Sequence, residues 1–472
     1  MTEYKKFIKF NQKIIILGFG SVGQGALPLL LRHIDITPEQ IKIITADEYG
    51  RVEADYYHVP ITVTPITKNN YKEILETNLN QGDFLLNASI NVSSTALIEF
   101  CHEHGALYLD ACIEPWAGGY VDASVPLAER SNYKLREEAL TLRQKRGKGP
   151  TAVLSHGANP GLISHWVKQA LINIAQDTNL ATNTPQTQQE WAQLAKKLNI
   201  TAIQCAERDT QVSNHAKQRN EFVNTWSVEG FAGEGCQPSE LGWGTHEKHF
   251  PMDGKHHGYG CEAAIYLERP GVTTRVRGWT PLEDSYQGFL ITHNESISIA
   301  DYLTIKENGV VHYRPTVYYA YHPCDDAVLS VHELNGKNLH LQPNLRLLMD
   351  DIYDGIDELG VLLMGHQKGV YWFGSALSIQ ETRNLAPYNN ATSLQVVAGV
   401  LAGLIWAIEN PEAGIVEPDE MPFERILEIA NPYLGKVVGK YSDWTPLKDR
   451  GVLFDEDVDE TDPWQFKNFR VV

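Results

Sequence analysis

A glycine-rich motif near the N-terminus could hold the phosphates of a dinucleotide. Gly18, Gly20 and Gly23 follow the order GxGxxG, after the apolar run IIIL and before an apolar helical segment. Glycines at this spacing allow a tight turn and a close approach to a pyrophosphate, which a helix N-terminus attracts. Asp47 ends the next apolar run, where its carboxylate would bind the adenosine ribose and repel a 2′-phosphate. The motif predicts an NAD site; the alternative is a glycine-rich turn that binds no ligand.

A second segment, residues 225–247, combines aromatic rings with carboxylates. It holds two Trp, four Glu and five Gly in 23 positions, and this glycine content favours an irregular loop. An indole face attracts a cation and a carboxylate accepts its hydrogen bonds, so the segment suits an alkylammonium. The alternative is a rigid surface loop whose Trp packs in the core and whose Glu side chains face solvent.

His293 and Glu295 lie in the segment ITHNES, at the end of an apolar run that predicts a strand. Two residues apart on a strand, they would share a face and could transfer a proton or bind an amine. An ordinary buried histidine is the alternative. A further group of His and Cys at 246–261 has spacings that fit no metal template, so we predict no metal site.

Short apolar runs that alternate with helical segments must position these residues. They predict buried strands at 13–17, 41–45, 83–86, 107–109 and 151–154, a helix after the first, and another helix at 93–104. Such alternation is typical of a doubly wound parallel sheet, whose ligands bind at the carboxyl ends of the strands. We therefore predict an α/β fold: a Rossmann-type doubly wound parallel sheet plus a second α+β domain.

The pattern of apolar runs along the chain changes near residue 160. We place an NAD-binding domain at 1–155, a second domain at 156–390, and C-terminal helices with an acidic tail at 391–472. In the second domain, 175–189 predicts an exposed loop between helices, and 288–292 and 310–320 predict β structure. Residues 393–408 are apolar on all sides, which predicts a buried helix near 391–410 that completes the first domain. The acids at 455–462 predict a solvated strip.

Composition excludes several classes of protein. The 472 residues carry 40 Lys plus Arg against 59 Asp plus Glu, a net charge of −19. Nucleic acids and anionic membranes would be repelled, so we expect neither as a partner. The six cysteines show no CxxC spacing, and no apolar run suits a signal peptide or a membrane span. We therefore predict a cytoplasmic protein with reduced thiols.

Six segments together resemble one family over nearly the whole chain. They are GFGSVGQG at 18–25, DACIEPW at 110–116, SHGANPGLISHW at 155–166, the stretch at 225–247, ITHNESISIADYL at 291–303 and YNNATSLQVVAGVLAG at 388–403. These segments resemble the bacterial homospermidine synthases, which belong to the saccharopine-dehydrogenase-like group.

The resemblance implies an amine condensation without net redox change. NAD⁺ accepts a hydride from the amine-bearing carbon of putrescine, a second putrescine replaces ammonia in the imine, and the hydride returns to give sym-homospermidine. Water must be excluded, because it would hydrolyse the imine. The resemblance also implies a homodimer whose second domain binds the substrate and supplies the interface, with spermidine as a further candidate substrate.

Roles of individual residues follow from the same resemblance. Trp226 would support a cationic intermediate, and Glu234 is the first choice for proton transfer. The remaining catalytic residues would be Glu207, Asn159 and His293, and the substrate would also meet Glu114, Glu295 and Asn91. Asn91 stands where the family has an acidic residue, so its contact with an ammonium would be weaker or indirect. The cofactor contacts would be Gly18, Gly20, Ser21, Val22, Asp47, Ala88, Ser89, Asp110, Ala111, Asn159 and Pro160.

Two other functions remain open at this point. A saccharopine-type amine or amino-acid dehydrogenase would bind a carboxylated substrate and show net NAD(P)H turnover, although few Arg residues fall in the site segments. A non-catalytic NAD-binding sensor or scaffold would bind the cofactor without turnover.

Overall fold

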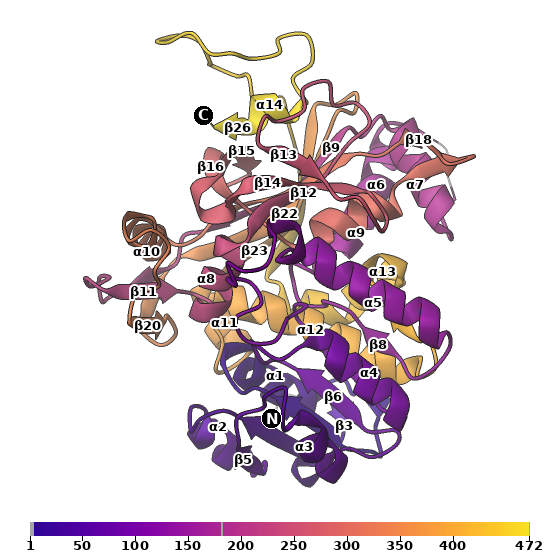
Figure 1. The fold of residues 1–472 in the computed structure, drawn as a ribbon, viewed down its shortest axis with the longest axis vertical. Coiled ribbons are helices and arrows are strands. Elements are labelled where there is room, and N and C mark those ends of the chain that lie inside the picture. Colours follow the sequence, from indigo (N-terminus) through magenta and orange to yellow (C-terminus); the bar gives the residue numbers. More distant parts are fainter. Residues whose placement is uncertain (1–3, 181–182, 472) are drawn as a thin grey trace.

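In the computed structural model, which describes residues 4–180 and 183–471, a seven-stranded parallel sheet forms the nucleotide half (Figure 1). Its order is β24-β8-β7-β6-β2-β4-β5. The chain passes from β2 to β4 and β5 and then returns to β6 on the other side of β2, and ligands bind at such reversals. The strands are β2 (Ile14–Leu17), β4 (Ile41–Thr45), β5 (Ile61–Val63), β6 (Phe84–Asn87), β7 (Leu107–Asp110), β8 (Ala152–Val153) and β24 (Ile415–Val416).

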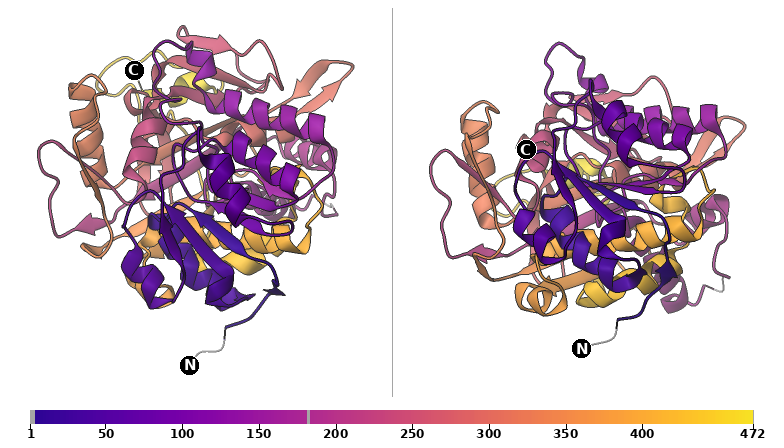
Figure 2. Two further views of the ribbon diagram at one scale, coloured as in Figure 1. Left: turned by 60° about the horizontal axis from the view of Figure 1, so that its bottom comes forward. Right: turned by 90° about the horizontal axis from the view of Figure 1, so that it is seen from below.

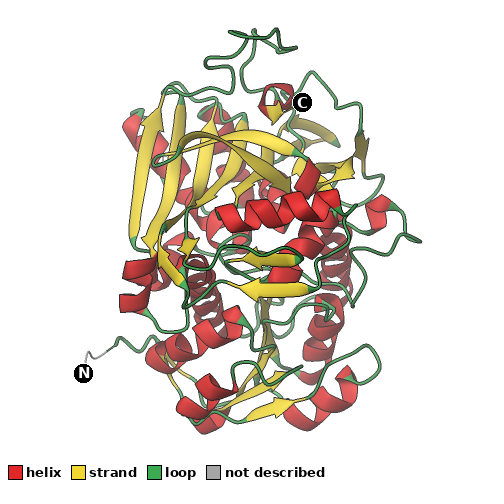
Figure 3. Ribbon diagram, turned by 90° about the vertical axis from the view of Figure 1, so that its left-hand side faces the viewer, coloured by secondary structure: helices red, strands yellow, loops and turns green. Residues whose placement is uncertain are grey.

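Alternate residues of β2 pack against helices on opposite faces of this sheet. Ile14 and Ile16 share a core with α1 (Ser21–His33) and α12 (Ala391–Glu409). Ile15 and Leu17 share another core with α4 (Ser94–His104). Successive side chains of a strand point to opposite faces, so an unbroken apolar run needs cover on both. Figure 3 shows helices on both sides of these strands, and the predicted doubly wound sheet is confirmed.

Helix α12 comes from the end of the sequence but packs in the nucleotide half. It contacts α1, β7 and α13 (Phe423–Ala430). Figure 2 shows α12 and α13, in orange, beside the indigo strands. In length and composition α12 could also cross a membrane, yet 83% of its apolar stretch is buried inside the fold. We therefore interpret α12 as a core helix.

A larger mixed sheet of eleven strands forms the second half of the described chain. Its main path is β13-β14-β12-β19-β9-β22-β23-β25, with β16, β15 and β26 joined beside β19. Only β9 and β19 are parallel neighbours in this described sheet. The strands are β9 (Ala202–Asp209), β12 (Pro238–Gly242), β13 (Gly254–His256), β14 (Ala264–Pro270), β15 (Arg275–Thr280), β16 (Asp284–Ile291), β19 (Thr316–His322), β22 (Ile356–Met364), β23 (Val370–Ser378), β25 (Lys436–Ser442) and β26 (Arg470–Val471).

The remaining elements cover these sheets or form short ribbons. The helices are α2 (Arg51–Tyr56), α3 (Tyr71–Asn78), α5 (Asn132–Arg146), α6 (Leu162–Asp177), α7 (Gln188–Lys197), α8 (Val228–Cys236), α9 (Asn294–Tyr302), α10 (Asp325–Gly336), α11 (Ile379–Leu385) and α14 (Phe466–Phe469). The two-stranded pairs are β1 (Ile8–Lys9) with β3 (Ile34–Asp35), β10 (Val212–Ser213) with β21 (Ile352–Asp354), β11 (Glu221–Asn224) with β20 (Asn344–Leu347), and β17 (Ile305–Glu307) with β18 (Val310–Tyr313). Five short 3₁₀ turns occur at Pro38–Gln40, Leu127–Glu129, Gly271–Thr273, Pro418–Glu420 and Asn431–Tyr433 of the described chain.

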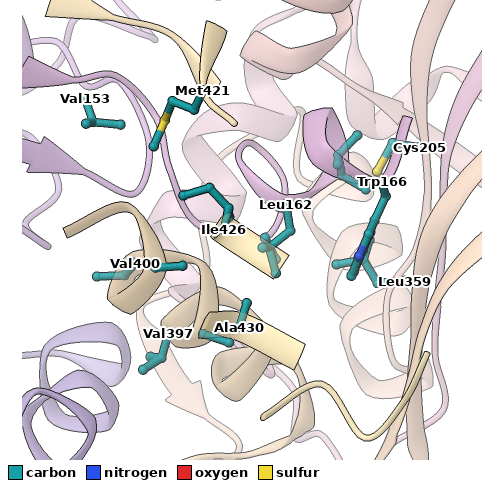
Figure 4. Close-up of a cluster of buried hydrophobic side chains, with 14 of the residues drawn as sticks. Val153, Leu162, Trp166, Cys205, Leu359, Val397, Val400, Met421, Ile426 and Ala430 are labelled. Carbon is teal, nitrogen blue, oxygen red and sulfur yellow. The ribbon is translucent and has the colours of Figure 1, made fainter. Parts of the chain in front are cut away.

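One hydrophobic core joins the two halves. Figure 4 shows Val153 of β8 and Val400 of α12 with Trp166 of α6. Cys205 of β9 and Leu359 of β22 belong to the same cluster of buried side chains. Because close packing tolerates little displacement, this shared core sets the position of one sheet relative to the other.

Two expectations about local structure are wrong. Residues 225–247 are not one irregular loop, because they contain α8 and β12. Ser227 caps α8 by accepting the Gly230 N–H at 3.1 Å, and the glycine at 235 leaves room for Val272. His293 is also not on a strand. It precedes α9 as its N-cap, with Glu295 in the first helical turn.

Other boundaries differ less. The predicted loop at 175–189 is shorter, because α6 continues to Asp177 and α7 begins at Gln188; residues 181 and 182 lie outside the described residues. The stretch 310–320 is divided between β18 and β19, with Pro315 between them. A proline lacks the N–H that a ladder needs, which explains the break. The acidic tail is mostly exposed, although Asp459 contacts His249 at 2.9 Å.

Candidate active site

A cavity of about 870 Å³ lies between the two halves. One end is formed by the carboxyl ends of β2, β4 and β6 and by the start of α1. The other end is formed by β9, β19, α8 and the start of α9. This is the edge of a doubly wound sheet where ligands bind, and the second half closes it.

The glycine motif leaves space for a ligand at the start of α1. Gly18 has φ +83°, and a Cβ there would lie 2.7 Å from the Ser89 backbone. Gly20 differs, because a Cβ built on it would meet no described atom within 4 Å, although the residue lines the cavity. The motif therefore turns tightly at Gly18 and faces open space at Gly20. The exposed N–H groups of α1 can bind an anion in that space.

Asp47 lies at the end of β4 and lines the same part of the cavity. It is exposed, and its Oδ1 accepts the Tyr49 N–H at 2.9 Å, which leaves the other carboxylate oxygen available. Ser21, Val22, Ala88, Ser89 and Ala111 line the cavity between Asp47 and the second half. These residues fit the ribose and pyrophosphate of a dinucleotide.

His293 lies between two carboxylates at the opposite end. Its Nε2 is 3.1 Å from Glu234 Oε2, and its Nδ1 is 3.2 Å from Glu295 Oε1. Burial disfavours the imidazolium, but Glu295 and Glu234 outweigh it and raise the pKa of His293 to about 10. The ring therefore carries a proton at neutral pH and can donate it toward Glu234.

A second carboxylate and a thiol face Glu234. Ligand atoms of Cys112, Glu114 and Glu234 all lie within 4.8 Å of one another, and the Cys112 thiol donates to Glu234 Oε1 at 3.4 Å. Burial and the charge of Glu234 raise the pKa of Glu114 well above its usual value. Asn91 contributes through its backbone N–H, which donates to Glu114 Oε2 at 3.3 Å. Its contact with Glu114 is thus independent of its side chain.

Glu207 of β9 forms the third acidic position. Its Oε2 accepts hydrogen bonds from the Tyr319 hydroxyl at 2.5 Å and from Asn159 Nδ2 at 2.9 Å. Burial raises the pKa of Glu207 to about 7 despite these two donors. A carboxyl group with this pKa can both accept and release a proton near neutral pH.

Trp226 lies partly buried at the cavity wall just before α8. Its Nε1–H donates to the Tyr321 hydroxyl at 3.1 Å, and its ring centroid lies 5.7 Å from that of Phe231. These contacts hold the indole in place, so its face can attract a cation in the cavity.

Three of the predicted site residues do not line the cavity. Asp110 is fully buried under it, where its carboxylate accepts the Ser155 N–H at 2.6 Å and the Tyr108 hydroxyl at 2.8 Å. Pro160 also lies outside the lining, and Glu295 lies behind His293. The other predicted residues line the cavity.

The sequence analysis missed several groups. Cys112 and Tyr319 touch Glu234 and Glu207 directly, and Arg346 of β20 lines the cavity. Behind Glu207, Asp209 and Asp357 face each other on β9 and β22, and burial raises the pKa of both. Tyr319 could have been proposed from the alternation of Tyr along β19, whereas the others carry no local signal.

Comparison with known proteins gives consistent matches along the whole chain. Residues 14–153 match the family model of the saccharopine dehydrogenase NADP binding domain, and 157–442 match the saccharopine dehydrogenase C-terminal domain. A homospermidine synthase of Blastochloris viridis is 50% identical over 476 residues, covering 100% of both chains. One of Mesorhizobium japonicum is 48% identical and covers 97% of this chain and 96% of its own.

Solved structures agree with these matches. The crystal structure of a homospermidine synthase from Legionella pneumophila in complex with NAD has a TM-score of 0.92 and 51% identity, and covers 99% of both chains. Saccharopine dehydrogenase from Saccharomyces cerevisiae has a TM-score of 0.52 at 9% identity, and covers 92% of this chain and all of its own, which shows a shared fold only.

Proposed function

The chain belongs to the homospermidine synthase family, and we propose on that premise how its cavity condenses two putrescine molecules into sym-homospermidine and ammonia. The observation that carries this proposal is a dinucleotide cradle and a group of buried carboxylates in one cavity. In the described chain, no Lys or Arg forms an ion pair with Glu114, Glu207 or Glu234. Glu234 already pairs with His293. Glu114 and Glu207 have no cationic partner among the described residues, and a cationic substrate would supply one, because buried carboxylates need a partner.

The cofactor is NAD. Although one matching family model is named for NADP, the exposed carboxylate of Asp47 suits ribose hydroxyls and would repel a 2′-phosphate. Arg51, the nearest arginine after it, pairs with Glu48. The Legionella relative is recorded in complex with NAD. Bound NAD supplies the acceptor and later the donor of the hydride.

The carboxylates accept and release the protons of the two amines. An amine must lose its proton before it can give up a hydride or attack an imine, and Glu207 and Glu234 are placed to accept those protons. Protonated His293 donates toward Glu234 and so holds that side chain in place. Asn159 holds Glu207 Oε2 in place at 2.9 Å.

The bonds balance without an external oxidant. The first putrescine loses a hydride from the carbon that bears the amine and becomes an imine. The neutral amine of the second putrescine adds to this carbon, the original C–N bond breaks, and ammonia leaves. Return of the hydride then gives the secondary amine. Trp226 stabilises the cationic imine through its ring face, and the buried walls exclude the water that would hydrolyse it.

Charge in the cavity opposes the dehydrogenase alternative. Arg346 is the only Lys or Arg of the described chain in the cavity lining, and it already pairs with Glu221 at 2.8 Å and Asp351 at 2.7 Å. An amino-acid substrate would need a free cation for its carboxylate. No such group is available at the amine end of the described cavity.

One incubation tests the proposed function. Purified protein is mixed with putrescine and sub-stoichiometric NAD⁺, the products are identified by mass spectrometry, and absorbance is followed at the NADH band. Homospermidine in excess over NAD⁺ with little standing NADH is expected. Steady NADH formation without homospermidine would instead identify a dehydrogenase, and cofactor binding without turnover would indicate a sensor.

We also propose a cytoplasmic homodimer. All six cysteines, which lie within the described residues, are unpaired, as a reducing compartment requires. Three adjacent apolar side chains, Val452, Leu453 and Phe454, are 78%, 86% and 81% exposed, which supports contact with a second copy.

A further inference from the structure

A buried carboxylate outside the cavity, that of Glu240 in β12, links the residue before His293 to the start of α5. Glu240 is 0% exposed and does not line the cavity. The Thr292 hydroxyl donates to Glu240 Oε2 at 2.6 Å, and the Asn132 N–H donates to the same oxygen at 2.7 Å. The Tyr133 N–H reaches Oε1 at 3.3 Å. Three donors from two distant segments thus converge on one side chain.

One of these two segments leads directly to a cavity residue. Thr292 is followed by His293, whose backbone is extended, with φ −146° and ψ 147°. Asn132 and Tyr133 begin α5, which lies outside the cavity lining. Glu240 therefore ties the residue before His293 to the start of a long helix.

The surroundings of Glu240 hold its side chain in a fixed position. It faces the N-terminus of the 15-residue helix α5, where the helix dipole favours negative charge. His257 Nε2 lies 3.3 Å from Glu240 Oε1, and the His257 ring stacks on Tyr133 with centroids 3.8 Å apart. Water cannot replace the lost bonds of a fully buried group, so removing one donor has a large effect.

We propose that Glu240 is a positioning residue that, through Thr292, holds His293 in register with Glu234. This inference rests on the proposed function, since it assigns the bond a role in the rate of condensation. Catalytic groups displaced by about 1 Å can lose roughly 100-fold in rate, so a small shift of His293 would be measurable.

A pair of substitutions at Thr292 isolates the hydroxyl. Thr292→Val removes it while keeping the shape, and Thr292→Ser keeps it. We expect Thr292→Val to lower kcat by about 10- to 100-fold with KM changed less than about threefold, while Thr292→Ser stays within about threefold of the parent. Equal kcat for the two variants would overturn the proposal.

The chain offers a matched control for loss of stability. Thr316 of β19 is also buried and donates to the buried carboxylate of Glu247 at 2.6 Å. The residue after it, Val317, does not line the cavity, whereas His293 does. Thr316→Val should lower Tm by a similar few degrees and leave kcat unchanged. If Thr316→Val lowers kcat as much as Thr292→Val does, the effect is structural and the proposal fails.

Two further measurements complete the test. Combining Thr292→Val with Glu240→Gln should lower kcat by less than the product of the two single effects, because both variants alter the hydrogen bond between Thr292 and Glu240. Fully additive losses in free energy would contradict this. Alkylation of Cys112 by iodoacetamide, followed by peptide mass spectrometry, should accelerate several-fold in Thr292→Val but not in Thr316→Val. The alkylation assay needs no turnover, so a parent protein without homospermidine activity would refute the proposed function separately. An unchanged alkylation rate would count against the positioning role.

Discussion

At the scale of residues, the chemistry depends on carboxylates whose neighbours differ. Glu207 is held by a phenol and an amide, whereas Glu234 is held by an imidazolium and a thiol. Similar side chains are therefore held by different donors, and burial raises the pKa of Glu207 to about 7. Substitutions of the neighbours, rather than of the carboxylates themselves, are the sharper tests of these roles.

The indole of Trp226 is expected to act through its charge distribution. Trp226→Ala should lower kcat/KM by roughly 30-fold or more, because a cation–π contact contributes up to about 2 kcal/mol. Trp226→Phe should retain part of the activity. Since phenylalanine also loses the donor to Tyr321, Tyr321→Phe measures that hydrogen bond alone. Trp243 lies outside the cavity and packs against Phe250 and Phe466, so Trp243→Phe is the control. Equal activity of the Ala and Phe variants would exclude the cation–π role.

The titration of Glu207 is expected to set the acidic limb of the profile of rate against pH, and Tyr319 is expected to determine the position of that limb. Glu207 has a pKa of about 7, raised by burial, and it must be ionised to accept a proton. The rate should therefore rise as pH increases through about 7. The Tyr319 hydroxyl stabilises the carboxylate, so Tyr319→Phe should raise the pKa of Glu207 and move the limb to higher pH. The profile of kcat/KM, which reports the free enzyme, is the measurement; a shift to lower pH would contradict the assignment.

At the scale of elements, the turn from β2 into α1 contains two glycines, Gly18 and Gly20, whose surroundings differ. A Cβ at Gly18 would collide with the Ser89 backbone, and the positive φ adds strain. A Cβ at Gly20 would meet no described atom within 4 Å and would extend into the cavity. One glycine thus serves the fold, and the other leaves open space in which we expect the ligand.

Gly20→Ala is accordingly expected to fold normally and bind NAD poorly. The Tm without cofactor should stay within a few degrees of the parent, while Kd for NAD should rise by about tenfold or more, because the methyl group occupies the space of the pyrophosphate. Gly18→Ala should instead lower Tm. Gly336→Ala, at the end of α10 with open space around its Cβ in the described structure, is the matched control. Unchanged NAD affinity in Gly20→Ala would place the pyrophosphate elsewhere.

At the scale of the whole molecule, the two sheets share one core and the cavity lies between them. Neither half contains the whole cavity, because Gly20 and Glu114 come from the first half and Glu207 and His293 from the second. The site therefore exists only when both halves are packed together.

The exposed apolar segment at the C-terminal end predicts association. Residues 452–454 lie in the extended yellow segment at the top of Figure 1. Light scattering should give about twice the 53.0 kDa chain mass. Leu453→Asp with Phe454→Asp should shift the mass toward the monomer, because burying two carboxylates is costly. Leu282→Asp, another exposed apolar position, is the control. A dimer unaffected by the double substitution would place the interface elsewhere.

The sequence by itself determined the elements and much of the chemistry. Apolar runs such as Ile14–Leu17 predicted the parallel strands, because a strand buried on both faces needs an unbroken apolar sequence. The glycine motif predicted the turn into α1, and the apolar segment around 393–408 predicted the buried helix α12. Resemblance across six segments identified the family. These signals are local or depend on residue identity, so they can be read along the chain.

Only the tertiary structure decided which side chains face one another. Cys112 contacts Glu234, which is 122 residues away in the sequence, and Tyr319 contacts Glu207, which is 112 residues away. Asp110 ends a strand as predicted, yet its carboxylate points below the cavity and accepts the Ser155 N–H. Residues 225–247 form α8 and β12 because Ser227 caps the helix and the pairing of Glu240 with Tyr266 organises the strand. Contacts, burial and pKa depend on packing between distant segments, which no local pattern encodes.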